Sequence, residues 1–247
     1  MSFKDFWTDE NNPKLNKSEY LYNARHIIVL ALILLSCVIL TLIFKNKSEK
    51  TKRILLKVFG WIFLFFEILS RLVNLIIAEN YTVESVAKII LPMHICSVMV
   101  WIFIISIFTN KQFLLNFSVI GGILATTAFL LYPAVGLNRV YMSFSCIYST
   151  FSHSLGFICC FLLMTLGIVK FEWKKIWQPF VCFTLMFSWG ALLNFVIFPG
   201  SDYMYMVNDP LELNLNFPYQ ILYALLIAVY ICAFYFIYGI IKKRKTS

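Results

Sequence analysis

Cys96, His94 and His153 are the residues of this chain best suited to covalent chemistry. Cys96 lies in the run LPMHICSVMVW, two residues after His94, and His153 lies in FSHSLGF. A cysteine thiolate attacks an acyl carbonyl, and an imidazole within reach takes and returns the proton. Residues two apart on an ideal helix point roughly 200° apart. His153 is therefore the better base for Cys96 unless Pro92 distorts the turn. His94 is expected to orient or polarise the reacting groups.

The same three side chains are acceptable zinc ligands that would leave one coordination position open. Because the spacing of His94 and Cys96 is not a usual zinc signature, we expect no metal and no cofactor. The seven cysteines include no C-x-x-C pair, and buried cysteines usually behave as small hydrophobes. Structural roles stay open for all three: a hydrogen-bonded core residue for His94, filling for Cys96 and an interfacial cap for His153.

A charged pair lies inside the apolar run FGWIFLFFEILSRLVNLIIA. Glu67 and Arg71 are four residues apart, and Asn74 continues the same helix face. An isolated charge near the centre of a bilayer costs about 2.5–3.5 kcal/mol. Such residues face a protein interior or a wet cavity. They therefore mark either a functional site or a structural ion pair that locks two helices together.

The composition requires a membrane around these residues. Of the 247 residues, 61% are hydrophobic and 13% are charged, whereas a soluble domain averages about 25% charged residues. Runs of about 20 apolar residues without strand alternation cross the hydrocarbon as helices. The sequence therefore predicts an all-α polytopic membrane protein with about seven transmembrane helices in one bundle. We place them at 27–44, 55–78, 87–108, 113–132, 150–169, 176–198 and 218–241.

Lysine and arginine collect in alternate connections between these runs. The basic connections are 45–54, 170–175 and the tail 242–247. The other connections contain one arginine between them; they are 79–86, 133–149 and 199–217. Because cytoplasmic loops carry such an excess of positive charge, we expect the N-terminus outside and the C-terminus in the cytoplasm.

This topology divides the chain into three parts. They are a polar extracytoplasmic segment (1–26), the transmembrane domain (27–241) and a basic cytoplasmic tail (242–247). The positive-inside bias accounts for the net charge of +9, so no nucleic acid is needed to explain it. The expected location is a cell membrane, the bacterial cytoplasmic membrane, with membrane phospholipids as partners.

The topology also brings polar residues from several runs to one level near the outer surface. Besides Cys96, His94 and His153, we expect these residues to line a polar cavity: Glu67, Arg71, Asn74, Asn138, Arg139, Asn194, Gln220 and Tyr223. The cytoplasmic halves of the runs offer little of this kind. A cavity open toward the outer leaflet is the economical explanation. Gly121 and Gly122 are expected to permit close helix packing.

Three segments carry a resemblance to a known family: LPMHICSV, YPAVGLNRVY and SFSCIYSTFSHSLGF. They resemble the YwaF-type family of bacterial integral membrane proteins, which is similar to the transmembrane protein 164 group of cysteine-dependent phospholipid acyltransferases. The resemblance runs from the second apolar run to the seventh. It implies that Cys96 matches the acyl-accepting cysteine and that His153 matches its partner histidine.

Two classes of function follow from these observations. The resemblance implies a lipid acyltransferase that moves fatty acyl chains between lipids through a thioester on Cys96. The alternative is a small-solute or proton-coupled transporter or receptor that uses the same cavity without covalent chemistry, with Glu67 and Arg71 as its gate. A transporter needs an inward polar route or discontinuous helices, and the apolar inner halves favour a one-sided site.

Overall fold

The computed structural model describes residues 3–9, 11–78, 81–133, 136–208 and 218–244, and its spans are all helical. Among these residues, six helices are long and apolar enough to cross a membrane, and the bent pair α5–α6 is the candidate for a seventh span. The predicted all-α fold is confirmed. The candidate spans are α3 (Ala24–Phe44), α4 (Glu49–Ile77), α5 (Val83–Ile90) with α6 (Ile95–Thr109), α7 (Gln112–Leu131), α8 (Phe144–Thr165), α9 (Trp177–Leu192) with the helical turns on either side of it, and α10 (Tyr219–Arg244).

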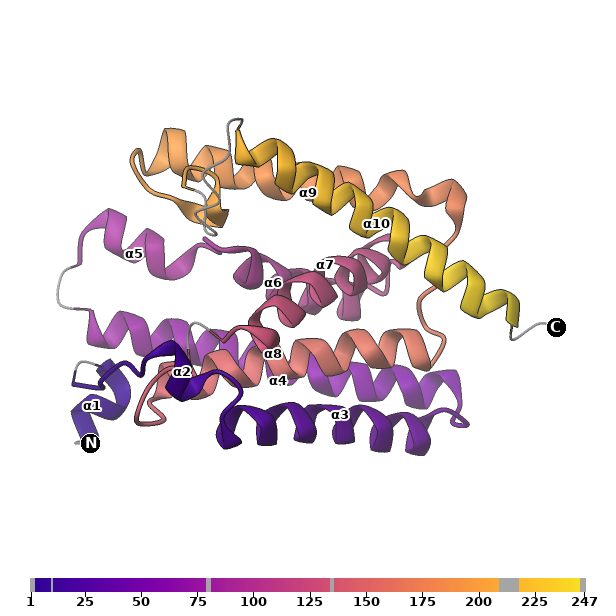
Figure 1. Ribbon diagram of the computed structural model, residues 1–247, viewed down its shortest axis with the longest axis horizontal. Helices are drawn as coiled ribbons and strands as arrows, with labels where there is room; N and C mark the ends of the chain where they lie inside the picture. Colours follow the sequence, from indigo (N-terminus) through magenta and orange to yellow (C-terminus); the bar gives the residue numbers. More distant parts are fainter. Residues whose placement is uncertain (1–2, 10, 79–80, 134–135, 209–217, 245–247) are drawn as a thin grey trace.

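The helices run between two ends of the molecule, and the labelled termini lie at opposite ends (Figure 1). The basic end contains the connections 45–48 and 166–176, and Lys52 in the first turn of α4 (Glu49–Ile77) donates to the Leu166 carbonyl there at 3.2 Å. The opposite end contains residues 91–94, 136–143 and 198–208. We call it the break end because α5 and α6 are separated there by residues 91–94. The alternation predicted from lysine and arginine is therefore present in space, and the assignment of the basic end to the cytoplasm stays a prediction.

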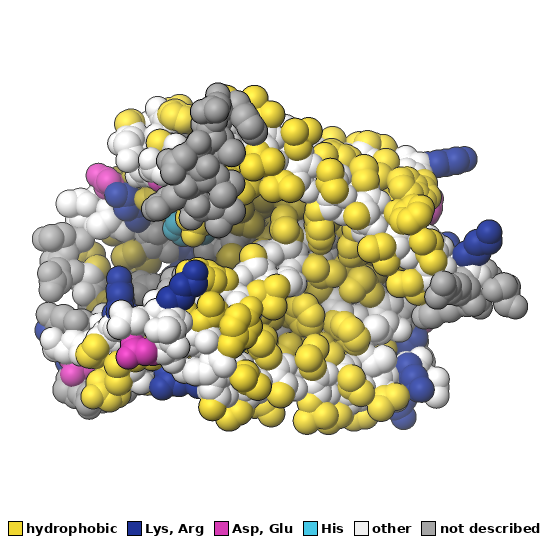
Figure 2. All heavy atoms as spheres, viewed as in Figure 1, with side chains coloured by type: hydrophobic (Ala, Val, Ile, Leu, Met, Phe, Trp, Pro, Cys, Tyr) yellow, Lys and Arg dark blue, Asp and Glu magenta, His cyan; other side chains and the backbone are white. Residues whose placement is uncertain are grey.

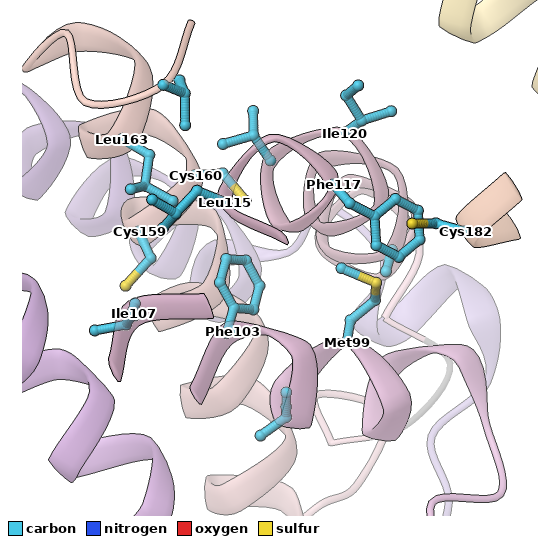
Figure 3. Packing of buried hydrophobic residues seen from close by; sticks show 14 of the residues in the cluster. Met99, Phe103, Ile107, Leu115, Phe117, Ile120, Cys159, Cys160, Leu163 and Cys182 are labelled. Atoms are coloured by element: carbon cyan, nitrogen blue, oxygen red, sulfur yellow. The ribbon is translucent and has the colours of Figure 1, made fainter. Parts of the chain in front are cut away.

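Helix α7 forms the centre of the bundle, with α6 and α8 as its main neighbours. Figure 3 shows their side chains meeting, with Met99 and Phe103 of α6 beside α7. A Cβ at Gly122 would lie 2.5 Å from Phe103 Cζ and 2.7 Å from Cys160 Sγ, and one at Gly121 would lie 2.8 Å from Met99 Sδ. The expected close packing at these two glycines is confirmed.

Hydrophobic side chains cover the middle of the visible face, while charged side chains gather toward its two ends (Figure 2). Helices α3 and α10 expose many large apolar side chains, including Ile28, Leu34 and Val229. Water would make this surface unfavourable, whereas lipid tails are as apolar as the side chains. The pattern fits a bilayer around the middle of the bundle.

Helix α4 begins six residues before its predicted start. The Ser48 side chain caps it by accepting from the Thr51 N–H at 3.2 Å, and such caps satisfy N–H groups that have no helical partner. Lys50 and Arg53 therefore belong to the helix, whereas the sequence predicted them to lie in a connection. The apolar criterion missed these turns because they are amphipathic and lie near the expected membrane surface.

Helix α8 also begins six residues early, at Phe144 instead of residue 150. Its first turns are poor in apolar residues, but Cys146 and Thr150 are buried against other helices. Polar residues inside a bundle are stable when protein groups satisfy them, so a helix that packs there does not need an apolar composition. At the other end of the chain, α10 continues to Arg244, so part of the predicted basic tail is helical.

The third predicted span is not one helix. Helix α5 ends at Ile90, α6 starts at Ile95, and the two are bent by 56°. Leu91 is extended, with φ −76° and ψ 146°, as expected for the residue before Pro92. Proline also lacks the N–H that would continue the helical ladder.

Candidate functional site

Cys96 lies at the N-terminus of α6, directly after the break. His94 is the N-cap residue with φ −114° and ψ 159°, and its side chain makes no capping hydrogen bond. The first hydrogen bond of the helix runs from the Val98 N–H to the His94 carbonyl at 3.0 Å. The N–H groups of Ile95, Cys96 and Ser97 therefore have no acceptor within the helix. Because His94 is not helical, the helical angle between it and Cys96 does not apply.

The break exposes backbone carbonyls, and long side chains satisfy them. In a continuous helix the carbonyls of Ile89 and Ile90 would accept from N–H groups four residues later. Here Arg71 Nη1 donates to both of them, and Trp189 Nε1 donates to the Pro92 carbonyl at 2.9 Å. An unsatisfied backbone group in hydrocarbon costs several kcal/mol, so these contacts make the break tolerable.

Glu67 balances the charge of Arg71. The two side chains form an ion pair, and the hydroxyl of Tyr148 on α8 donates to the same carboxylate. Glu67 is 3% exposed, and the guanidinium carbon of Arg71 lies 5.7 Å from the centre of the Trp101 ring. The predicted ion pair is present, with Glu67 buried and the Arg71 side chain 16% exposed, and its contacts join α4, the end of α5 and α8. Asn74 is exposed on α4.

His153 is held in one orientation within α8. Its Nδ1 lies 2.7 Å from the Ser149 carbonyl, and its ring stacks on Phe129 with 3.7 Å between the centroids. A carbonyl only accepts, so Nδ1 carries the proton and Nε2 of the neutral ring is a lone pair. In the described part of the chain, this buried Nε2 has no hydrogen-bond partner.

The depths of Cys96 and His153 differ from those expected. His153 lies nine residues after Phe144, the first residue of α8, and not one turn into its helix. Cys96 is the second residue of α6 and not three turns into one continuous helix. Both differences follow from the early start of α8 and the break before α6. The approach of the Cys96 sulfur to the His153 ring stays a prediction.

Asn138 and Arg139 contact the N-terminal segment. Arg139 Nε lies 3.2 Å from the Asp9 carboxylate, and Nη1 donates to the Asn12 carbonyl at 2.7 Å. The backbone carbonyl of Asn138 accepts from the Leu15 N–H at 2.8 Å. The segment, with its short helices α1 (Phe3–Thr8) and α2 (Lys17–Tyr20), is thereby fastened to the break end. The structure gives these two residues a role in tethering that the sequence did not predict.

Asn194, Gln220 and Tyr223 lie at the connection between α9 and α10. Asn194, which is 1% exposed, accepts from the Tyr203 N–H at 2.7 Å and donates to the Tyr203 carbonyl at 2.9 Å. It belongs to the π-helical turn η2 (Leu193–Ile197) that follows α9. Gln220 donates to the Met206 carbonyl at 3.0 Å. The Tyr223 ring lies 5.4 Å from the tyrosine ring one turn earlier. The resolved contacts of Asn194 and Gln220 brace this connection.

The surface is hollowed at the break end, and a histidine side chain is visible in the hollow (Figure 2). The zinc arrangement considered for His94, Cys96 and His153 is not found. Within the described ranges, no three His, Cys, Asp or Glu side chains lie together as metal ligands would.

Sequence reasoning missed Tyr148, Trp189 and Trp101, which support the charged pair and the break. Tyr148 had one signal, the unusual polarity of the run SFSCIYSTFSHS before and within α8. The two tryptophans had none, because tryptophans in apolar runs are ordinary for a membrane protein.

The apolar spans and the buried polar groups beside a broken span define a multi-pass helical membrane protein. Residues 21–238 match the TMEM164 family. The chain belongs to this family, as the similarity to the transmembrane protein 164 group implied. No curated protein and no solved structure matches it.

Proposed function

We propose that this protein transfers fatty acyl chains between membrane lipids through a thioester on Cys96, with His153 as the general base. The observation that carries the proposal is the state of His153. Its Nδ1 proton is committed to the Ser149 carbonyl, and its buried Nε2 lone pair has no partner in the described chain. A general base needs such an available lone pair.

The N-terminus of α6 supports the same reaction. The sulfur of Cys96 would attack the carbonyl carbon of a donor ester while its proton moves to His153 Nε2. The oxyanion that forms needs hydrogen-bond donors, and the N–H groups of Cys96 and Ser97 have no helical acceptor. The partial positive charge of a helix N-terminus also stabilises a developing anion.

The remaining steps return the protein to its starting state. The ester C–O bond breaks, and the leaving alcohol takes the proton from His153. The hydroxyl of an acceptor lipid then loses its proton to His153 and attacks the thioester. The C–S bond breaks, and the thiolate of Cys96 takes that proton back. We propose that Arg71, Glu67 and Tyr148 position the N-terminus of α6 by holding the break.

A second candidate is a binding or transport site for a small solute at the same place. The discontinuous α5–α6 span favours it, because many transporters place substrates at half-helix termini. Against it stand the buried hydroxyls nearer the basic end. Ser106 and Ser118 bond to each other at 2.8 Å and to carbonyls of their own helices, so they do not extend a polar route.

Intact-mass measurement after incubation with phospholipid distinguishes the two candidates. Wild-type protein in nanodiscs should gain the mass of one acyl chain, and hydroxylamine should remove it. Cys96→Ser should give no adduct, while Cys232→Ser, at an exposed position on α10, should behave as wild type. His153→Ala should slow adduct formation by about 10²–10⁴-fold. An adduct that survives in Cys96→Ser, or none in wild type, would refute the thioester.

A further inference from the structure

A cavity of about 400 Å³ lies at the basic end, and neither Cys96 nor His153 is among its lining residues. It is lined by the first turns of α4, the end of α6, the start of α7 and the connection after α8. The lining combines two chemistries. Lys50, Arg53 and Lys57 are cationic, and the side chains of Ile107 and Phe108 are apolar.

The cations lie on one face of α4, because spacings of three and four residues bring Lys50, Arg53 and Lys57 into line. Among the described residues, no carboxylate lines the cavity. The neighbouring Glu49 pairs with Lys52, which is not a lining residue. The positive charge of the cavity therefore has no counterion among its lining residues.

Arg53 is held in place by a neutral partner. Its Nη1 donates to Oδ1 of Asn110, the residue that ends α6 in a left-handed conformation with φ 54°. Asparagine tolerates this conformation. The contact orients the guanidinium and leaves its full charge available for an anion.

The apolar part continues from the cavity onto the lipid-facing surface. Trp61 lies one turn beyond Lys57 on α4 and is 61% exposed. Its ring meets that of Phe108 edge to face, with 5.0 Å between the centroids. Ile54 of the cavity lining is also exposed. Along one face of α4, cationic side chains are thus followed by an exposed aromatic and aliphatic surface.

We propose that this cavity binds an anionic phospholipid of the leaflet at the basic end. Lys50, Arg53 and Lys57 contact the phosphate of the headgroup, and an acyl chain lies along Phe108 and Trp61. A soluble phosphate compound would use only the cationic half of the cavity, whereas a lipid matches both halves and their order along the bilayer normal. This site is independent of the acyl transfer proposed at Cys96.

The charge pattern is tested by native mass spectrometry of protein released from nanodiscs of phosphatidylglycerol and phosphatidylcholine in equal amounts. Wild-type protein should retain phosphatidylglycerol in preference. Lys50→Gln/Lys57→Gln should lower that preference by about tenfold or more, since each basic residue near a surface contributes on the order of 1 kcal/mol. The control Lys45→Gln/Lys47→Gln removes the same charge from exposed positions outside the cavity and should change the preference little.

Equal losses in the two double variants would overturn the site, because they would reduce it to a general attraction between a basic surface and anionic lipid. Trp61→Ala keeps every charge and should lower retention of phosphatidylglycerol through loss of the acyl contact. Soluble glycerol phosphate should not displace the retained lipid. Displacement at equal concentration would show that the headgroup alone binds, and would overturn the assignment of a lipid.

Discussion

The two ends of the bundle handle polar side chains in different ways. At the break end they are turned inward and bond to backbone, as Arg71 does at the end of α5 and Asn194 does at Tyr203. At the basic end many cations, such as Lys50 and Lys57, are exposed and follow a regular helix. At the break end, buried polar side chains thus satisfy backbone that is irregular. Hydrocarbon supplies no hydrogen bonds, so the side chains must.

Labelling the two ends from known sides of the membrane tests which end faces the cytoplasm. Asn46→Cys lies in the basic end, and Tyr81→Cys lies just before α5 at the opposite end of α4. A membrane-impermeant maleimide should label residue 81 on intact cells and residue 46 only after permeabilisation, because lysine-rich connections stay in the cytoplasm. The reverse pattern would assign the break end to the cytoplasm.

Two ion pairs, one at each end, should differ in how much they contribute to the free energy of unfolding. Removing one partner of the Glu67–Arg71 pair, by Glu67→Gln or Arg71→Met, should lower the free energy of unfolding by roughly 3–5 kcal/mol, because a buried charge loses its partner. Arg71→Met also frees the carbonyls at the end of α5. Thermal unfolding in detergent measures both variants.

The matched control is the Glu172–Lys175 pair at the basic end, where the two side chains are 51% and 45% exposed. Glu172→Gln should change the free energy of unfolding by no more than about 1 kcal/mol, as for most exposed pairs. Similar losses for Glu172→Gln and Glu67→Gln would mean that burial does not separate the two ends.

Tyr148→Phe should have the next largest effect. It removes a hydrogen bond to the charged carboxylate of Glu67, for which about 1.5–3 kcal/mol is typical. Tyr230→Phe serves as control, since the Tyr230 hydroxyl donates to a neutral acceptor, the Ile120 carbonyl, at 2.8 Å. That change should cost about 0.5–1.5 kcal/mol. Equal costs in unfolding experiments would argue against a charged Glu67.

The smallest effect is expected for the tether of the N-terminal segment. Asp9→Asn removes the ion pair with Arg139, whose two side chains are partly exposed, and should cost about 1 kcal/mol or less. Limited proteolysis should nevertheless cut the segment faster, because the pair helps to hold it on the 136–143 connection. A segment that is cut at the wild-type rate would show that the backbone bonds at Leu15 and Val140 suffice.

Parts of the site were predictable from local spacing. Glu67 and Arg71 could be paired from sequence because a helix brings residues four apart together. The partners Tyr148 and Trp189 could not, since they come from helices far along the chain. Asn138 and Arg139 were placed at the expected end, but the resolved contacts join them to residues 9–15, because nothing in the spacing indicated that the N-terminal segment folds back.

The number of spans, the alternation of basic connections and the charged pair were determined by the sequence alone. Each depends on a local rule: about 20 apolar residues cross a bilayer, positive loops alternate, and helices repeat every 3.6 residues. Only the tertiary structure shows that Arg71 holds the break before Cys96 and that α4 and α8 begin earlier than predicted. It alone also places Lys50, Arg53 and Lys57 around a cavity with Phe108. These features depend on packing between helices, because in hydrocarbon a polar group is stable only beside the particular partner that satisfies it.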